Sequence, residues 1–279
     1  MCEMDEVDIL IIGGGLTGMA LMCALAPLGY RVRLAETRRM TQNKVDILET
    51  RSIALSPASI QILKQFDAWP TLRETASLIK TIHISEQGRF GQARLHADID
   101  KPLGAVVEMP ARVTALDAIT GVASLQTETE EKTVRAQWVV AADGSHSSVR
   151  TLCGADASIK KYAEYALAAN ITLSRAHGNI AYERFTSDGP LALLPLNGPH
   201  MALVWTLNPE QAELLKIMDV ADFLNALQCA FGYRVGRFLA VGPRQTYPLQ
   251  QIMMPKQVHK KVVFVGNAAH TLHPVAGQG

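Results

Sequence analysis

Three motifs of this chain carry residue types that suit the phosphates and sugar hydroxyls of a dinucleotide. They occupy residues 13–18, 143–150 and 266–279, far apart in a chain of 279 residues. Glycine lets a backbone approach a phosphate closely because it has no side chain, and an aspartate accepts hydrogen bonds from hydroxyl groups. Any one motif alone is weak support. Together, and in this order, they predict one large dinucleotide cofactor held by remote parts of the sequence.

The first motif is a glycine-rich turn inside a predicted strand-helix-strand unit at residues 7–12, 16–28 and 31–35. Gly13 permits the tight turn, Gly15 lets the backbone approach a pyrophosphate, and Gly18 lets the helix and strand pack closely. The helix then directs its free N–H groups and the positive end of its dipole at the phosphates.

Glu36 stands at the tip of the second predicted strand. A carboxylate there accepts hydrogen bonds from both ribose hydroxyls and disfavours a 2′-phosphate. The adenosine end is therefore predicted to be unphosphorylated, as in FAD or NAD. A helix is predicted at residues 56–66, with Ser56 as its N-cap and Pro57 in its first turn. Arg51 precedes this helix and is either a phosphate contact or a solvated surface arginine.

The second motif begins at Asp143 and Gly144, directly after a predicted buried strand at residues 138–142. An aspartate at the carboxyl end of such a strand faces the ligand crevice, where it would hold a ribityl hydroxyl. Ser147 and Arg150 would then tie the following loop down, or Arg150 would meet a nucleotide donor.

The third motif follows a predicted strand at residues 262–265 and combines a tight turn at Gly266 with a proline-containing loop and a Gly-Gln-Gly end. Such a run places bare backbone beside a flat ring. His270 and His273 are spaced like metal ligands, but no third ligand is near and Pro274 breaks the helix that would align them. We therefore expect no metal site.

The stretches between the motifs predict a second, different layer. Short alternating runs broken by glycine suggest antiparallel strands over residues 78–107, and an amphipathic helix is expected at 219–231. Further sheet strands are expected at residues 166–173, 180–185, 191–196 and 201–207. The predicted fold class is α/β, a Rossmann-like cofactor domain interwoven with an α+β substrate domain on a mostly antiparallel sheet. The cofactor domain is assigned residues 1–77, 110–152 and 258–279, and the substrate domain residues 78–109 and 153–257.

Composition excludes several function classes. The 27 Lys and Arg against 26 Asp and Glu give a net charge of +1 and no electrostatic case for nucleic acid. The four cysteines lack CxxC spacing, so free thiols in a reducing compartment are expected. The uncharged stretch at residues 9–30 is neither a signal peptide nor a membrane span, because acids precede it and three glycines interrupt it. We expect a cytoplasmic protein with at most peripheral contact with the inner membrane.

The three motifs resemble the GxGxxG, DGxxSxxR and GDAAHxxxPxxGQG elements of the class A flavoprotein aromatic hydroxylases, which have the p-hydroxybenzoate hydroxylase fold. Residues 181–196 and 231–249 are similar to the ubiquinone-biosynthesis hydroxylases within that family. Asn267, where most relatives carry aspartate, is most like the 2-octaprenyl-6-methoxyphenol 4-hydroxylase branch.

The resemblance implies FAD, a transient NAD(P)H donor and O2, acting through a C4a-hydroperoxyflavin to hydroxylate a polyprenylated phenol in ubiquinone biosynthesis. It implies other ubiquinone-biosynthesis proteins as partners. His270 and His273 are the candidates for proton handling. The implied cofactor-binding residues are Gly13, Gly15, Gly18, Glu36, Arg51, Asp143, Gly144, Arg150, Asn267, Pro274, Gly277, Gln278 and Gly279.

Three alternatives remain open at this point. They are a sibling hydroxylase acting at another ring position, a flavin-dependent oxidase or reductase without oxygen insertion, and a non-catalytic assembly subunit.

The sequence departs from the family pattern in two places. Relatives continue for roughly a hundred residues past Gly279, beginning with a helix whose N-terminus faces the flavin. They also have about twenty more residues after Met109, which form a helix and a strand of the cofactor layer. The sequence therefore looks truncated, and weak or no FAD binding is expected of this fragment.

Overall fold

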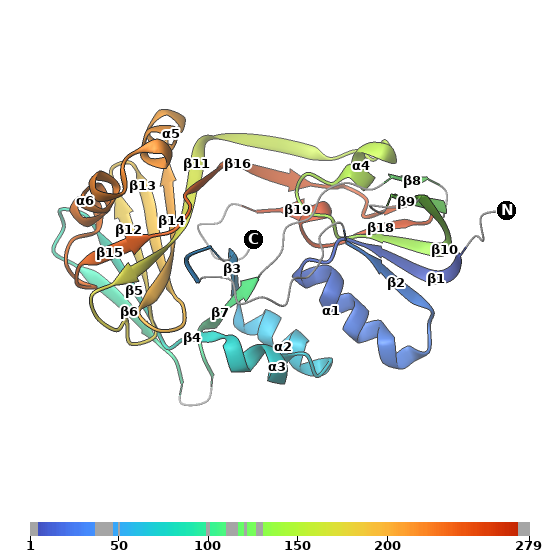
Figure 1. The fold of residues 1–279 in the computed structure, drawn as a ribbon, viewed down its shortest axis with the longest axis horizontal. Coiled ribbons are helices and arrows are strands. Elements are labelled where there is room, and N and C mark those ends of the chain that lie inside the picture. The colour runs from blue at the N-terminus through green and yellow to red at the C-terminus, as the bar shows by residue number, and fades with distance from the viewer. Residues whose placement is uncertain are drawn as a thin grey trace.

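The computed structural model describes residues 5–36, 47–49, 51–98, 101–109, 117–119, 122–126 and 131–272. These residues form three sheets (Figure 1). The predicted combination of a parallel layer and a mostly antiparallel sheet is confirmed.

The first sheet has a parallel centre. Its order is β17-β18-β10-β1-β2, and β1, β2, β10 and β18 run parallel. Short, continuous apolar runs form these strands because both faces are covered. Helix α1 lies against one face, and Val149 of α4 and Met254 pack into the core of the sheet. The bounds are β1 Asp5–Ile12, α1 Leu16–Leu25, η1 Ala26–Leu28, β2 Val32–Ala35, β8 Asp117–Ile119, β9 Val122–Gln126, β10 Glu131–Ala141, α4 Ser148–Leu152, β17 Val258–His259, β18 Val262–Phe264 and η3 Gly266–Ala268.

The second sheet has nine strands in the order β19-β16-β11-β14-β13-β12-β5-β6, with β15 paired to β11. Helices α5 and α6 cover its outer face, where Phe223 and Leu227 meet Leu193, Leu203 and other buried side chains. The bounds are β5 Thr81–Glu86, β6 Gln92–His96, β11 Ser158–Leu173, β12 Ile180–Thr186, β13 Gly189–Pro195, β14 His200–Leu207, α5 Pro209–Ile217, α6 Val220–Phe231, β15 Phe238–Val241, β16 Gln245–Met253 and β19 His270–Thr271.

A small third sheet, β3-β7-β4, lies between the other two and is backed by two helices (Figure 1). Its bounds are η2 Ile47–Glu49, β3 Arg51–Leu55, α2 Pro57–Gln65, α3 Trp69–Thr75, β4 Ser77–Ile79 and β7 Gly104–Met109. The predicted start of α2 is confirmed: Pro57 opens the helix, and the hydroxyl of Ser56 accepts a hydrogen bond from the backbone N–H of Ser59 at 3.2 Å.

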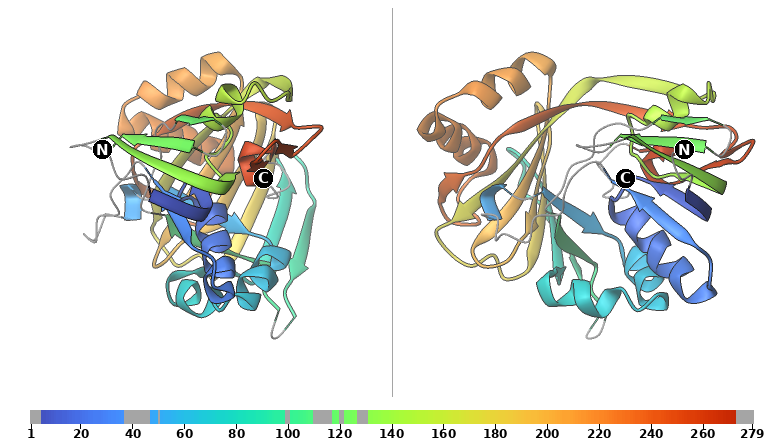
Figure 2. Two further views of the ribbon diagram at one scale, coloured as in Figure 1. Left: turned by 90° about the vertical axis from the view of Figure 1, so that its right-hand side faces the viewer. Right: turned by 45° about the vertical axis from the view of Figure 1, so that its right-hand side comes forward.

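Two long strands connect the layers. Strand β11 has 16 residues, so it extends for about 50 Å. Figures 1 and 2 show β11 and its partner β16 running from the nine-stranded sheet across to the parallel sheet. The two layers are therefore continuous rather than separate bodies.

The antiparallel strands predicted over residues 78–107 are confirmed, although the sequence did not indicate all of their partners. Strands β5 and β6 are antiparallel as expected, but β5 also pairs in parallel with β12, and β7 pairs with β3 and β4 in the small sheet. The proposed domain division stays a prediction, and β4 lies across its boundary at residue 77. No helix among the described residues is long and apolar enough to cross a membrane.

Replacing Phe223 by alanine tests the outer core. The ring is fully buried and the guanidinium of Arg244 lies 4.8 Å above its centre. We expect Phe223→Ala to lower the free energy of unfolding by about 3–5 kcal/mol, because it leaves a cavity. Urea denaturation measures this. Leu214→Ala, on the exposed side of α5, is the control and should change the value by less than about 0.5 kcal/mol. Equal effects of the two variants would contradict the assignment of this core.

Candidate functional site

The first two motifs and the described part of the third, residues 266–272, meet at one edge of the parallel sheet. Register pairs Ile12 with Ala35 and with Ala141, and Ala141 with Phe264, so four strands end side by side. Backbone hydrogen bonds continue this alignment into the loops: Val265 N donates to the Ala141 carbonyl oxygen at 3.0 Å. The predicted convergence of three remote loops is confirmed.

The first motif and the second are in backbone contact. Gly13 has φ +108°, and a Cβ there would collide with the carbonyl oxygen of Ala142. A Cβ at Gly18 would collide with the carbonyl oxygen of Gly13. Both positions therefore require glycine for the reasons expected. Beside Gly15 the space is open to at least 4 Å, which suits the predicted approach of a pyrophosphate.

Glu36 is held beside the glycine turn of the first motif by a hydrogen bond. Its Oε2 accepts a hydrogen bond from the backbone N–H of Gly14 at 2.7 Å. The carboxylate is half-buried at the carboxyl end of β2, where a ribose was expected. Its contact with ribose hydroxyls stays a prediction.

Asp143 is only partly satisfied by the protein. Its Oδ2 accepts from the Ser148 hydroxyl and from the Val149 backbone N–H, both at 3.2 Å. Its Oδ1 is buried and has no hydrogen-bond partner among the residues that the structure describes. A buried carboxylate oxygen without a donor is costly, so this atom fits a hydroxyl supplied by a bound molecule, such as the ribityl chain of FAD. Gly144, the next residue, has φ +87° and open space beside it.

Arg150 joins the second motif to the third. Its guanidinium is nearly buried and donates to the Ala268 carbonyl oxygen at 2.8 Å and to the Ser145 carbonyl oxygen at 2.7 Å. Ser145 in turn accepts from the hydroxyl of Thr271 at 3.0 Å. Of the two roles considered for Arg150, the structure supports the tie between loops. Sequence reasoning missed Ser145 and Thr271, although both lie inside the motifs.

The third motif also touches the first. Gly266 has φ +57°, and a Cβ there would lie 2.8 Å from Oγ1 of Thr17 in α1. Asn267 is exposed, and His270 is exposed on β19 opposite Met253. Outside the described residues lie His273, Pro274, Gly277, Gln278, Gly279 and the side chain of Arg51.

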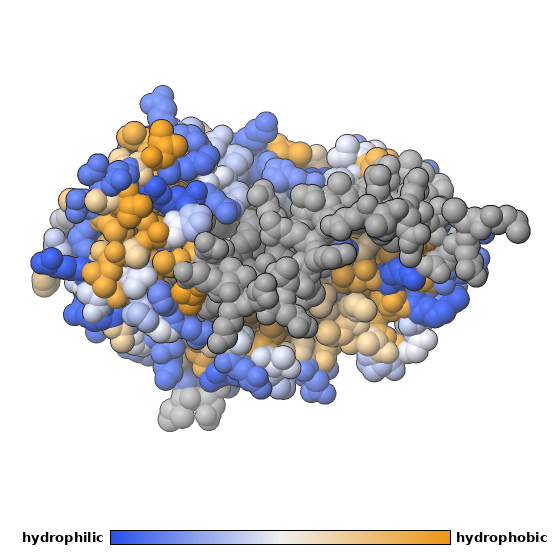
Figure 3. All heavy atoms as spheres, in the orientation of Figure 1, coloured by the Kyte–Doolittle hydropathy of each residue, from blue (hydrophilic) through white to orange (hydrophobic). Residues whose placement is uncertain are grey.

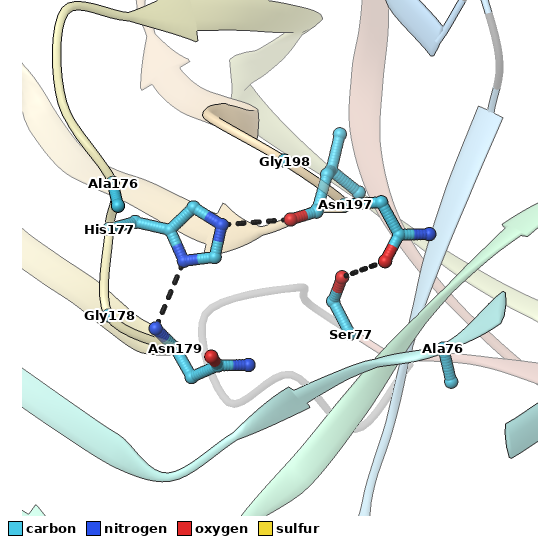
Figure 4. Close-up of a pocket in the computed structure, with 9 residues that line it drawn as sticks. Ala76, Ser77, Ala176, His177, Gly178, Asn179, Asn197 and Gly198 are labelled. Carbon is cyan, nitrogen blue, oxygen red and sulfur yellow. Dashed lines mark hydrogen bonds between the residues drawn. The ribbon is translucent and has the colours of Figure 1, made fainter. Parts of the chain in front are cut away.

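A separate hollow of about 280 Å³ includes none of the motif residues (Figure 4). It lies between β4 and the turns that follow β11 and β13. His177 Nδ1 accepts from the Asn179 N–H at 3.0 Å, so Nε2 donates to the Leu196 carbonyl oxygen at 2.8 Å. Ser77 donates to Asn197 at 3.2 Å. These polar groups form hydrogen bonds with one another. We therefore interpret the hollow as a gap between packed turns and not as a reaction site.

Comparison with known proteins agrees with this geometry. The family model described as FAD binding domain matches residues 6–116 and 103–279. The chain is 32% identical to ubiquinone hydroxylase UbiL of Rhodospirillum rubrum, over 99% of this chain and 69% of that protein. It is 28% identical to 3-demethoxyubiquinol 3-hydroxylase of Escherichia coli, over 99% and 76%.

Solved structures share the fold. PqsL of Pseudomonas aeruginosa superposes with a TM-score of 0.75 at 20% identity, covering 99% of this chain and 82% of PqsL. The p-nitrophenol 4-monooxygenase PnpA of Pseudomonas putida gives 0.75 at 18% identity, covering 99% and 76%.

Replacing Arg150 by methionine tests the tie between the loops. The change leaves two carbonyl oxygens without their charged donor, so we expect a loss of about 2–3 kcal/mol in unfolding free energy. Thermal unfolding measures it. Arg73→Met, on the exposed side of α3, should change stability by less than about 0.5 kcal/mol. If the two variants melt alike, Arg150 does not hold the loops together.

Proposed function

The chain belongs to the FAD binding domain family, as a flavin-dependent monooxygenase of the ubiquinone-biosynthesis hydroxylase group, and on that premise we propose that its substrate is a polyprenylated phenol. The remaining reactants are NAD(P)H, as a transient donor, and O2. When bound, the flavin of FAD supplies the redox chemistry that activates oxygen.

The chain's own residues bind and orient the cofactor. We assign Glu36 to the adenosine ribose and the N-terminus of α1, at the open side of Gly15, to the diphosphate. Asp143 Oδ1 takes a ribityl hydroxyl, and Arg150 holds the second and third motifs together around it. The unpartnered oxygen of Asp143, at the meeting point of the three loops, is the observation that carries this assignment.

The ring position is a finer proposal. Asn267 supports the 2-octaprenyl-6-methoxyphenol 4-hydroxylase branch. The similarity to the Escherichia coli 3-demethoxyubiquinol 3-hydroxylase favours a sibling enzyme of another ring position as the second candidate. Supplying each phenolic intermediate with NAD(P)H and locating the new hydroxyl group distinguishes the two. Peroxide without hydroxylated product would instead indicate an oxidase, and no turnover with either would indicate an assembly role.

We also propose peripheral contact with the inner membrane, because a polyprenyl tail is apolar and partitions into lipid. Exposed Leu214, Ile217 and Val220 lie around the turn between α5 and α6. Figure 3 shows apolar side chains gathered over these helices. Their position fits such contact.

Titration with FAD tests the cofactor assignment. We expect Asp143→Ala and Glu36→Ala each to raise the dissociation constant about 10-fold to 100-fold, because each removes hydrogen-bond acceptors for sugar hydroxyls. Quenching of flavin fluorescence measures the dissociation constants. The dissociation constant of the unaltered chain also tests the expectation of weak FAD binding.

Ser148→Ala is the matched control. It removes a donor to Asp143 Oδ2 but leaves Oδ1 unchanged, so the dissociation constant should rise much less. Unchanged affinity in Asp143→Ala, in a variant that melts as a folded protein, would refute the role of that residue.

A further inference from the structure

Glu183 is a carboxylate on the inner face of the nine-stranded sheet. Its neighbours on β12, Tyr182 and Arg184, point outward: the Tyr182 ring contacts Phe231 of α6 at 5.7 Å, and Arg184 Nε donates to the Ala230 carbonyl oxygen at 3.0 Å. Because side chains alternate along a strand, Glu183 points to the opposite face. Figures 1 and 2 show that face turned away from α5 and α6, toward the parallel sheet.

The register of the strands places Glu183 in a row of mostly small, apolar side chains. Direct partners in a sheet point to the same face, so the row can be followed from strand to strand. In order across the sheet it contains Gln245, Ala168, Val204, Ala192, Glu183, Ile84 and Ala93. The residues of this row from Ala168 to Ile84 are half-buried.

The neighbouring row on the same face is covered. Ala181 and Ala202 pack against Ile79 of β4 and Val106 of β7, together with Leu194. Glu183 therefore lies where the covered part of the inner face ends and an apolar shelf begins. We define this shelf as Ala168, Val204, Ala192 and Ile84.

The carboxylate has no hydrogen bond or ion pair among the described residues, and burial raises its pKa from 4.5 to about 7. The adjacent positions on this face are Ala192, Ile84, Ala181 and Phe185, all without charge. Diagonally beyond Ile84 lies Glu86, which is exposed and pairs with Arg89 at 2.9 Å. An unpaired carboxylate beside apolar side chains lowers the free energy of unfolding. Such a group therefore indicates a site where a bound molecule supplies the missing hydrogen-bond donor.

We infer that Glu183 is a substrate-binding carboxylate, which accepts a hydrogen bond from the hydroxyl of a phenol ring lying on the apolar shelf. The alanines leave room for a flat ring, and the aliphatic side chains of Val204 and Ile84 contact its face. A hydrogen bond from the ring hydroxyl to a carboxylate draws the proton away from the ring oxygen and makes the ring richer in electrons. Hydroxylation of a phenol needs such a ring, so this inference rests on the proposed function.

The test compares two probes that differ in one hydroxyl group. The chain, supplemented with FAD, is titrated with ortho-prenylphenol and with prenylbenzene by calorimetry. We expect the unaltered chain to prefer the phenol by at least about tenfold, because a hydrogen bond to a charged group discriminates by that much. Glu183→Ala should bind the two probes with about equal affinity, and the preference of Glu183→Gln for the phenol should be intermediate.

Glu86→Gln is the matched control on the same face, and it should keep the full preference. An undiminished preference in Glu183→Ala, or no preference in the unaltered chain, overturns the inference. The FAD titration described above is independent of Glu183. Normal cofactor binding with an unchanged preference in Glu183→Ala would therefore remove this inference and leave the proposed function intact.

A ligand-free measurement checks the environment of Glu183. The pKa of Glu183 is about 7 in the folded protein and 4.5 in the unfolded chain, so the folded protein loses stability as pH rises from 4.5 to about 7. Glu183→Gln cannot ionise, so it should melt at the same temperature as the unaltered chain below pH 4.5 and at a higher temperature above pH 7. Parallel melting curves at all pH values would show that Glu183 is solvated, and the inference would fail.

Discussion

The site depends on the alignment of four parallel strand ends. Ile12, Ala35, Ala141 and Phe264 occupy one register row, so the loops after them begin at the same height. The loops after β1 and β10 then approach so closely that Gly13 admits no side chain, and Gly18 admits none because α1 packs against the carbonyl oxygen of Gly13. Because the contacts are made by backbone atoms, they tolerate little displacement. A shift of one strand would separate the N–H groups of α1 from the carboxylate of Asp143, and no continuous dinucleotide site would remain.

Long-range ties hold this arrangement. Arg150 is separated from Ala268 by more than a hundred residues, yet its guanidinium donates to that carbonyl oxygen. The hydroxyl of Thr271 donates to Ser145 across a similar separation. Both ties are buried or half-buried, where a hydrogen bond is strengthened by the low local dielectric. The second and third motifs thus form one structural unit around the edge of the sheet.

Much of the cofactor layer could be predicted from sequence, because its signals are local. A buried parallel strand reads as a continuous apolar run, and the turn at Gly13 is visible in the residues that follow it. The cap at Ser56 was predictable for the same reason. The pairing of β7 with β3 was not, since it joins segments about fifty residues apart. The role of Arg150 stayed open because both of its acceptors are backbone carbonyl oxygens. Every residue has such an oxygen, so the sequence does not identify the acceptors. The isolation of Glu183 emerges only from the register of seven strands.

Strand β16 has a mechanical consequence. At one end its Gln245 pairs with Ala168 of β11, and at the other its Met253 pairs with His270 of β19, just after η3 of the third motif. An extended strand is stiff along its axis and can slide only by breaking its whole hydrogen-bonded ladder. Strand β16 therefore connects the inner face of the nine-stranded sheet, at Gln245, with the strand that follows the turn at Gly266. A displacement of the nine-stranded sheet at its inner face would therefore also displace the loop of the third motif at the end of the parallel sheet.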